Sequence, residues 1–274
     1  MLFTKIKLNA GTPQRSPLSP LIYIIYVNDL PEEIKHDCSL SQFADDIAIW
    51  TSAYTRAFST HKLQKAVNML EGWCRRWRVK LNGEKSKLVF ISRMRKANDE
   101  NHCLQLFNDI IRPVNQAKFL GVKIDQWLSF KSHFEDIHNR SKKRLNVLRV
   151  LARAGVEPKV LMKLYKIYVR PILEYGSLSF IAAPKSQLDK LQKIQNEGLR
   201  ICLRLPSYIR TGLLHECASI EPINDRLLSL NSHLLRKMYY QNPDVKKLID
   251  GTVDNGISPL ALILRQGNLS SLKS

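Results

Sequence analysis

Two adjacent carboxylates, Asp45 and Asp46, stand between two short stretches that are typical of β-strands. Residues 39–43 precede the pair and residues 47–51 follow it, so the segment predicts a strand, a tight turn and a second strand. Because neighbouring carboxylates repel each other, a fold that holds two of them in one turn usually supplies a cation. The alternative is an acidic turn in contact with water, which the dipeptide alone favours. The flanking sequence decides between these two interpretations.

A loop rich in glycine, proline and serine, residues 11–20, leads into an apolar run at residues 21–27. Proline is tolerated in the first turn of a helix, so this run predicts a buried helix over residues 17–29. An ordinary loop followed by a core helix would give the same pattern. Composition alone therefore assigns no chemistry to the segment.

The loop, the helix and the acidic hairpin, in this order and spacing, resemble the palm of a reverse transcriptase. The resemblance is greatest to the reverse transcriptases of non-LTR retrotransposons, the Jockey-like LINE elements of animals. It continues with a tryptophan-bearing helix, an Asn-x-x-Lys turn and a strand, and then with a short hairpin and a helical region. These later blocks occupy residues 73–90, 119–125, 128–133, 164–176 and 191–195. The resemblance covers the chain to about residue 230.

This resemblance implies two-metal nucleotidyl transfer, in which two divalent ions stabilise the attacking and leaving oxygens. Asp45 would be the principal ligand of Mg²⁺ (or Mn²⁺) and Asp46 a supporting one, with Phe43 and Ala44 packed beneath the turn. Lys85 resembles the lysine of the Asn-x-x-Lys turn, where a cation can stabilise the pyrophosphate leaving group. Considered by itself, Lys85 is better interpreted as a surface lysine in a turn.

The same resemblance implies further contacts with the substrates. Pro13, Gln14 and Ser16 would lie beside the incoming nucleotide and the template base. A primer grip would be formed by Phe119, Leu120 and Gly121, where glycine allows close approach of the backbone. The expected partners are an RNA template, a DNA primer and, if the chain is active, a dNTP.

Two departures from the family pattern predict that the chain is inactive by itself. Residues 1–10 contain no acidic residue, so the upstream aspartate strand is missing, as are the fingers. Another polypeptide would have to supply them. Arg15 stands where the family usually has glycine, and its side chain would crowd the path of the nascent base pair or add a phosphate contact.

The charge of the chain favours a polyanionic partner. Forty-three Lys and Arg residues face 24 Asp and Glu residues, a formal net charge of +19 with a pI near 9.8. Residues 131–210 alone carry seventeen basic and six acidic side chains. Nucleic acid is the first candidate and an anionic membrane surface the second.

One predicted helix, residues 188–205, combines an apolar stripe with a basic back. At about 100° per residue, four basic side chains cluster opposite the stripe and are candidates for contact with a nucleic-acid backbone. They are Lys190, Lys193, Arg200 and Arg204. A merely soluble amphipathic helix would show the same pattern.

These patterns predict an α+β fold, a partial right-hand polymerase palm (an antiparallel sheet with helices) followed by an all-helical thumb. The palm would occupy residues 1–130, the basic thumb 131–240 and a loosely structured tail 241–274. Strands are expected at residues 39–43, 47–51, 87–92, 104–107 and 117–124. Helices are expected at residues 17–29, 56–77, 142–154, 158–172 and 188–205, with Gly155 as a C-terminal cap and Pro171 ending or kinking its helix.

The five cysteines are scattered and form no Cys-x-x-Cys pair, which favours a reducing intracellular compartment, the nucleus or the cytoplasm. Neither a signal peptide nor a membrane-spanning segment is predicted. Two other functions remain open besides a polymerase fragment: a catalytically silent RNA- or DNA-binding module derived from such an element, and a basic helical scaffold that binds protein.

Overall fold

The computed structural model describes residues 16–30, 34–92, 102–180, 183–243, 245–247 and 250. The chain divides into two compact units, with the boundary between Leu120 and Gly121. Its helices and small antiparallel sheets confirm the predicted mixture of α and β structure. None of the described helices combines the length and apolarity needed to cross a bilayer.

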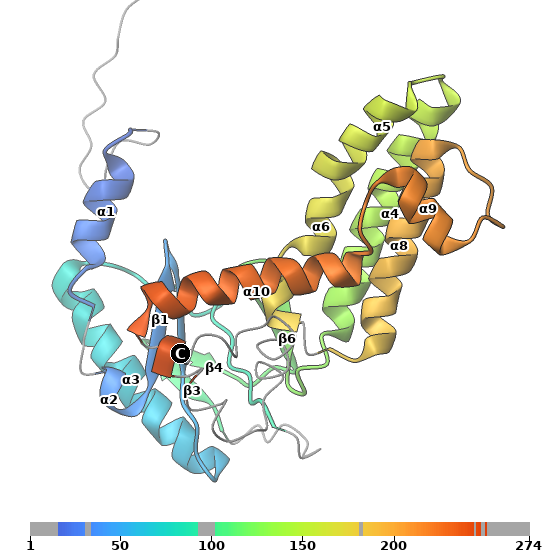
Figure 1. The fold of residues 1–274 in the computed structure, drawn as a ribbon. Coiled ribbons are helices and arrows are strands. Elements are labelled where there is room, and N and C mark those ends of the chain that lie inside the picture. The colour runs from blue at the N-terminus through green and yellow to red at the C-terminus, as the bar shows by residue number, and fades with distance from the viewer. Residues whose placement is uncertain are drawn as a thin grey trace, which may run out of the picture. The chain divides into compact units, whose positions relative to one another are not determined.

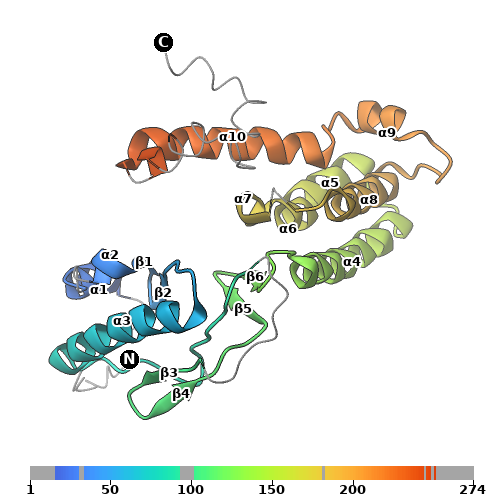
Figure 2. The ribbon, with the colours of Figure 1, turned by 90° about the horizontal axis from the view of Figure 1, so that it is seen from below.

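Unit 1 contains three helices and the strands β1 to β5. They are α1 (Ser19–Val27), α2 (Ile34–Asp37), β1 (Ser39–Phe43), β2 (Asp46–Trp50), α3 (Arg56–Trp77), β3 (Leu104–Leu106), β4 (Asp109–Ile111) and β5 (Gln116–Phe119). The hairpin of β3 and β4 lies beside α3 (Figure 2). Helix α3 begins where the Thr55 side chain accepts a hydrogen bond from the Phe58 N–H and ends at Arg78 in a left-handed conformation. Its buried stripe, which includes Leu70 and Trp73, confirms the helix predicted over residues 56–77.

The strand predicted over residues 87–92 is wrong. Leu88 and Phe90 are buried as the alternation requires, but only an isolated bridge joins Leu88 to Pro113. Proline has no N–H, so it cannot extend a ladder in that direction. The strand predicted over residues 117–124 is in fact two strands, β5 and β6 (Val122–Asp125), joined by a turn. Strand β4 was not predicted.

Helix α1, the dark blue helix labelled in Figure 1, was expected to be buried, and this expectation is also wrong. No residue of this helix is buried, and the exposed fractions of Leu21, Ile24 and Ile25 are 56%, 61% and 68%. A helix that is apolar on all sides is usually buried, so the exposure of α1 departs from that pattern. Its contacts to the rest of unit 1 include polar ones, such as the bond from the Tyr26 hydroxyl to the Trp77 carbonyl.

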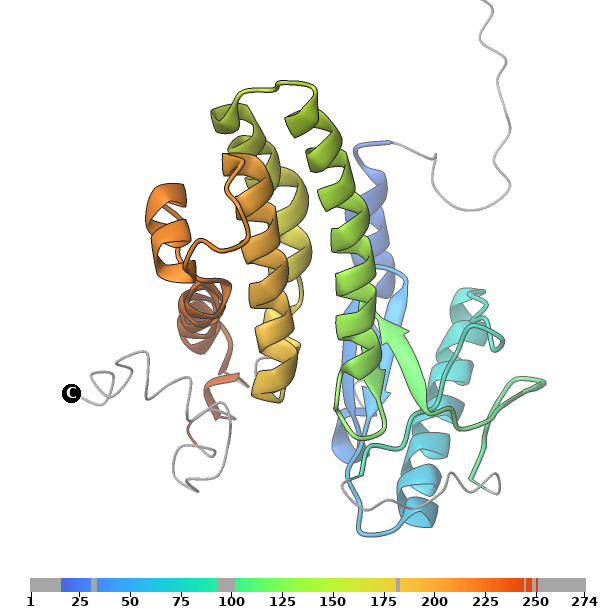
Figure 3. The same cartoon turned by 90° about the vertical axis from the view of Figure 1, so that its right-hand side faces the viewer.

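In its described residues, unit 2 begins with β6 and contains otherwise only helices and loops. Its helices are α4 (Lys131–Arg153), α5 (Pro158–Leu164), the π-helix η1 (Tyr165–Val169), α6 (Arg170–Glu174), α7 (Ser177–Phe180), α8 (Lys185–Leu203), α9 (Thr211–Ala218) and α10 (Ile223–Gln241). Figure 3 shows α4 (green) and α8 (orange) running side by side. Leu145 and Leu148 of α4 and Leu191 and Leu199 of α8 are fully buried in one core.

Helix α4 begins eleven residues before the predicted start, because Asp125 organises the turn that precedes it. The carboxylate of Asp125 accepts hydrogen bonds from the backbone N–H groups of Trp127, Ser129 and Phe130 and from the Ser129 hydroxyl. Burial alone would raise the pKa of the Asp125 carboxyl, but these donors outweigh burial and hold the pKa below its usual value. At the other end Gly155, with φ +89°, follows the helix as predicted.

The helix predicted over residues 158–172 is interrupted by the π-helix η1. Four fully buried residues, Leu161, Tyr165, Val169 and Leu173, recur every four positions. In an α-helix this spacing would turn the buried face by about 40° at each step and by about 120° over three steps. The extra residue of a π-turn compensates about 100° of that drift. Pro171, which cannot donate to the carbonyl of Ile167, accounts for the position of the interruption.

Candidate active site

The two predicted metal ligands lie at the tip of the β1–β2 hairpin. Phe43 pairs with Asp46 in the antiparallel register, so Ala44 and Asp45 form a two-residue loop. Both aspartates are exposed. The hairpin is attached to the core of unit 1 through Leu40 and Ile49. The geometry therefore presents two adjacent carboxylates on a short, well-paired turn.

The loop needs an unusual backbone conformation, which two side chains support. Ala44 has φ +51°, in the left-handed region, which costs about 1–2 kcal/mol for a residue other than glycine. Its carbonyl accepts hydrogen bonds from the Tyr23 hydroxyl of α1 at 2.9 Å and from the Gln42 amide at 3.1 Å. These bonds hold the residue next to Asp45 in place. The expectation that Phe43 packs beneath the turn is wrong, because 65% of Phe43 is exposed.

The donor chemistry of the turn fits a hard divalent cation. Asp45 and Asp46 supply carboxylate oxygens, the type of ligand that Mg²⁺ prefers. The described residues contain no group of three or more metal-ligating side chains. Mg²⁺ commonly keeps several water ligands and binds through one or two carboxylates together with substrate phosphates. The two carboxylates are therefore ligands of the right type for such a site, and water and substrate phosphates would supply the remaining ligands.

A third aspartate, Asp29, links α1 to α3 and was not singled out in the sequence. Its two carboxylate oxygens accept hydrogen bonds from the indole N–H of Trp73 at 2.9 Å and from that of Trp77 at 2.8 Å. These bonds, together with the Tyr26 contact, hold α1 against α3, and α1 in turn provides Tyr23 to the carboxylate turn. A signal existed in the sequence, since the two tryptophans are spaced i, i+4 and their N–H groups need acceptors.

Lys85 lies in a separate turn of unit 1. The side-chain oxygen of Asn82 accepts a hydrogen bond from the Lys85 N–H, and the Asn82 carbonyl accepts one from Ser86. A side chain on Gly83 would collide with Asp109, because a β-carbon there would lie 2.2 Å from the carboxylate. The Asn-Gly-x-Lys sequence is thus explained by turn geometry. Lys85 itself is exposed and forms no ion pair with Asp45 or Asp46 in the described part of the chain.

Of the predicted nucleotide-binding residues, only Ser16 is described, and Pro13, Gln14 and the unusual Arg15 lie outside the described residues. The Ser16 hydroxyl accepts a hydrogen bond from the Leu18 N–H, and the Ser16 carbonyl accepts one from the Ser19 N–H. In this structure Ser16 therefore forms the turn that leads into α1.

The predicted primer grip coincides with the turn between β5 and β6. Phe119 ends β5, and the two loop residues Leu120 and Gly121 both have positive φ, +44° and +82°. Positive φ at both positions is typical of a type I′ hairpin turn. A β-carbon on Gly121 would lie 3.0 Å from the ring of Tyr175, so glycine also allows this close contact.

The four basic residues predicted on α8 fall into two classes. Lys190 and Lys193 are exposed. Arg200 donates to the Ile209 carbonyl at 3.2 Å, and Arg204 donates to the Val156 carbonyl at 3.0 Å, so both arginines also support nearby loops. The apolar stripe on the other side of α8 is buried or half-buried, as predicted.

Two glutamines of α8, which no sequence pattern indicated, attach α10 to this helix. The side-chain oxygens of Gln192 and Gln195 both accept hydrogen bonds from the N–H of Ile223, the first residue of α10. The Gln195 amide also donates to the Glu221 carbonyl. Backbone N–H groups at the start of a helix have no partner within the helix, so these contacts fix α10 on α8.

Comparisons with known proteins agree with the sequence resemblance. Residues 2–124 match the family described as reverse transcriptase (RNA-dependent DNA polymerase). The chain is 28% identical over 228 residues to the probable RNA-directed DNA polymerase from transposon BS of Drosophila melanogaster, covering 80% of this chain and 25% of that protein. It is 27% identical over 257 residues to the RNA-directed DNA polymerase from mobile element jockey of the same species, covering 90% and 28%.

The jockey polymerase of Drosophila funebris is 26% identical over 231 residues, covering 80% of this chain and 25% of that protein. The chain thus spans about a quarter of the length of these relatives. No solved structure matches it. The family match includes the turn with Asp45 and Asp46, and the relatives extend the similarity through most of unit 2. Residues 2–124 therefore match the reverse transcriptase (RNA-dependent DNA polymerase) family, and most of the chain is similar to the RNA-directed DNA polymerases of mobile elements such as jockey.

Proposed function

We propose that this chain is part of an RNA-directed DNA polymerase, and that the β1–β2 turn supplies two of its metal-binding carboxylates. The observation that carries the proposal is the conformation of the turn. Ala44 is held in a left-handed conformation by Tyr23 and Gln42, directly before two exposed, adjacent aspartates. Strained backbone that is fixed by its surroundings is common at functional sites. The match of residues 2–124 to the reverse transcriptase family supports this assignment.

Asp45 would be the principal ligand of Mg²⁺ or Mn²⁺ and Asp46 the supporting one. The metal ions would supply charge stabilisation at the attacking primer hydroxyl and at the leaving pyrophosphate. Lys85, on its exposed turn, would act as a cation near the leaving group. Among the protein's own groups, Tyr23 would position the turn, because it bonds to the carbonyl of the residue before Asp45.

The substrates would be an RNA template, a DNA primer and a dNTP. Pro13, Gln14 and Ser16 would lie beside the nucleotide, and the turn Phe119–Gly121 would hold the primer end. In this proposal unit 1 corresponds to part of the palm and unit 2 to the basic thumb. The further carboxylate and the fingers would come from polymerase segments that this sequence does not provide, which matches the coverage of about a quarter of the relatives.

The test is primer extension on a poly(A) RNA template with a DNA primer and Mg²⁺, with the chain alone and with the chain fused to the upstream part of a jockey-type polymerase. Asp45→Asn is compared with Asp37→Asn, which makes the same charge change at another exposed aspartate of unit 1. Extension by the fusion that is lost in Asp45→Asn and kept in Asp37→Asn supports the proposal. Extension that survives Asp45→Asn refutes the role of the turn.

A metal titration gives a second readout that does not require activity. Mn²⁺ binding by the wild-type chain, followed by electron paramagnetic resonance, should weaken in Asp45→Asn and remain unchanged in Asp37→Asn. If both variants bound Mn²⁺ equally well, the metal site would not be at the proposed turn.

A second candidate function is a catalytically silent RNA- or DNA-binding module. It is favoured by the excess of basic residues at positions 131–210. If the chain has this function, the logarithm of its affinity for nucleic acid should fall linearly with the logarithm of the salt concentration. The substitution Asp45→Asn should not change that affinity. Affinity that does not depend on salt would exclude it.

A further inference from the structure

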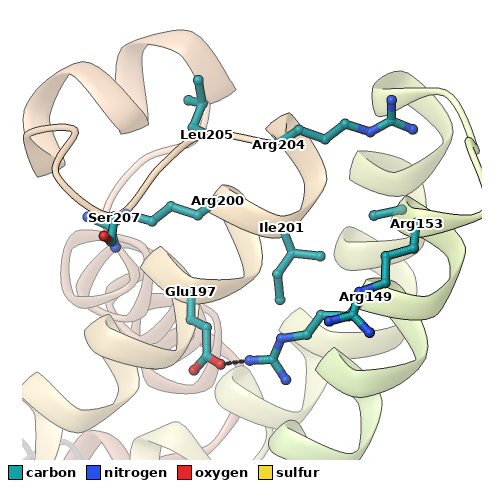
Figure 4. A pocket seen from close by; sticks show the side chains of 9 residues that line it. Arg149, Arg153, Glu197, Arg200, Ile201, Arg204, Leu205 and Ser207 are labelled. Atoms are coloured by element: carbon teal, nitrogen blue, oxygen red, sulfur yellow. Dashed lines mark hydrogen bonds and ion pairs between the residues drawn. The ribbon is translucent and has the colours of Figure 1, made fainter.

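A pocket of about 480 Å³ opens between the last turns of α4 and α8 (Figure 4). Arginines dominate its polar lining, and one acidic residue accompanies them. The lining consists of Arg149, Ala152, Arg153, Glu197, Arg200, Ile201, Arg204, Leu205 and Ser207. All of these residues belong to unit 2, so the pocket is defined within a single compact unit.

The four arginines differ in how far their donors are already used. Arg149 pairs with Glu197, which joins α4 to α8. Arg204 and Arg200 each donate to a backbone carbonyl, through one terminal nitrogen. Arg153 is exposed and forms no ion pair or hydrogen bond within the described part of the chain. Each guanidinium has five N–H donors, so unused donors remain on the wall of the pocket.

The positive charge of the side chains that line the pocket is larger than the negative partial charge at the C-terminal ends of the two helices. Four guanidinium groups and the Glu197 carboxylate give a net charge of +3. The C-terminal ends of α4 and α8 each contribute about −0.5, which leaves about +2. In addition, the Nε of Arg200 is buried and has no hydrogen-bond partner among the described residues. The pocket is therefore built for an anion of more than one charge or for a short run of anionic groups.

The rest of the lining is apolar. Ala152, Ile201 and Leu205 form it, and Figure 4 shows Ile201 between Arg149 and Arg204 on the side where α4 and α8 meet. Arg200 points instead toward the loop with Ser207. An apolar surface beside guanidinium groups suits a ligand that carries a phosphate next to a sugar or base. Free inorganic phosphate would leave the apolar part in water.

We propose that this pocket binds the backbone of a single-stranded nucleic acid, with a phosphate on Arg153 and its neighbouring sugar on Ile201. The exposed Lys193 lies on the same basic side of α8, seven residues before Arg200 and thus about 10 Å away along the helix. A strand along α8 can therefore reach the pocket and Lys193 together. This inference rests on the proposed binding of nucleic acid by the chain.

The test measures the affinity of the whole chain for a fluorescent oligouridine by anisotropy over a range of salt concentrations. Arg153→Gln removes the arginine without a described partner, and Lys143→Gln removes an exposed charge elsewhere on the same helix. We expect Arg153→Gln to weaken binding several-fold and to reduce the magnitude of the slope of log affinity against log salt by about 0.7, the value for one contact to a single strand. Lys143→Gln should leave both quantities nearly unchanged. Circular dichroism checks that both variants fold.

A crosslinking experiment locates the ligand independently. An oligouridine that contains 4-thiouridine should crosslink to the peptide that includes Ser207, and Arg153→Gln should reduce that product. Wild-type-like affinity and salt slope in Arg153→Gln would overturn the proposed site while leaving general nucleic-acid binding intact. If inorganic pyrophosphate displaced the labelled oligouridine at concentrations as low as those at which unlabelled oligouridine does, the choice of ligand would be overturned. A wild-type chain that binds no oligouridine would overturn both the inference and the proposed binding of nucleic acid, whereas the test of Asp45 would still stand.

Discussion

Gly198 is the position in unit 2 where a single methyl group should do the most damage. This glycine lies within α8 and is buried against the neighbouring helices. A β-carbon at this position would lie 2.8 Å and 2.9 Å from two atoms of the Tyr165 ring and 3.1 Å from Leu145. Carbon atoms prefer separations of about 3.5–4.0 Å, so the overlap is about 1 Å. The Tyr165 ring is fully buried, and because protein interiors are close-packed, a shift of the ring would disturb its neighbours.

The magnitude follows from two opposing effects. Alanine is favoured over glycine in a helix interior by about 1 kcal/mol. Overpacking a buried site costs about 1–3 kcal/mol, and the clash with two core residues places this site in the upper half of that range. We expect Gly198→Ala to lower the free energy of unfolding of unit 2 by about 1–2 kcal/mol. Gly72→Ala in α3 is the matched control, because a β-carbon there meets nothing within 4 Å. That substitution should stabilise unit 1 by about 0.5–1 kcal/mol.

Hydrogen exchange read by mass spectrometry in increasing urea separates the two units, because peptides from α8 and α3 report on them individually. With a urea dependence of about 2 kcal/mol per molar, the midpoint for α8 should fall by about 0.5–1 M in Gly198→Ala. The midpoint for α3 should rise in Gly72→Ala. An α8 midpoint that stays or rises in Gly198→Ala would refute the close packing of α8 on Tyr165.

Three further predictions concern polar groups. Asp29→Asn should destabilise unit 1 by about 1–2 kcal/mol in urea, because the Trp73 indole loses a charged acceptor, whereas the exposed Asp37→Asn should change the midpoint little. Tyr23→Phe should speed amide exchange in the β1–β2 hairpin and leave α4 unchanged, since only the hairpin loses the bond to Ala44; equal exchange would show that this bond does not hold the turn. Burial lowers the pKa of His133, and the charge of nearby Arg140 lowers it further, so the folded state favours the neutral form of His133. Unit 2 should therefore lose stability as the pH falls below about 6.5, where the unfolded chain takes up a proton on this histidine more readily. Unfolding at pH 7 and pH 5 should show a smaller loss in His133→Asn, and an identical pH dependence would contradict the prediction.

The parts of the fold that the sequence predicts well are those whose patterns are local. Helix α3 has a capping threonine and a regular apolar stripe, and both of its ends are as predicted. The hairpin of β1 and β2 follows from its alternation and its turn. Failures occur where a distant partner decides the outcome. The segment around Leu88 alternates like a strand, but its one β-bridge within the described residues is to Pro113, and no residue of the apolar helix α1 is buried.

The candidate site shows the same division. The carboxylate turn is visible in the sequence because Asp45 and Asp46 are neighbours. The side chains that hold it come from other elements: Tyr23 precedes Ala44 by 21 positions, and no local pattern links them. The arginine pocket likewise combines residues of α4 and α8 that are about fifty positions apart, such as Arg149 and Glu197. Spacing rules relate residues within one element and cannot join two helices across a core.

The π-turn in unit 2 makes the chain sensitive to its own length. The segment Tyr165–Val169 holds one residue more than an α-helix needs for the same rotation. A gene copy that lost one codon here in frame would still encode a helix. Every side chain after the deletion would then point about 100° away from its present direction, and Leu173 would leave the core. For this stretch, the number of residues is therefore as strict a requirement as their identity.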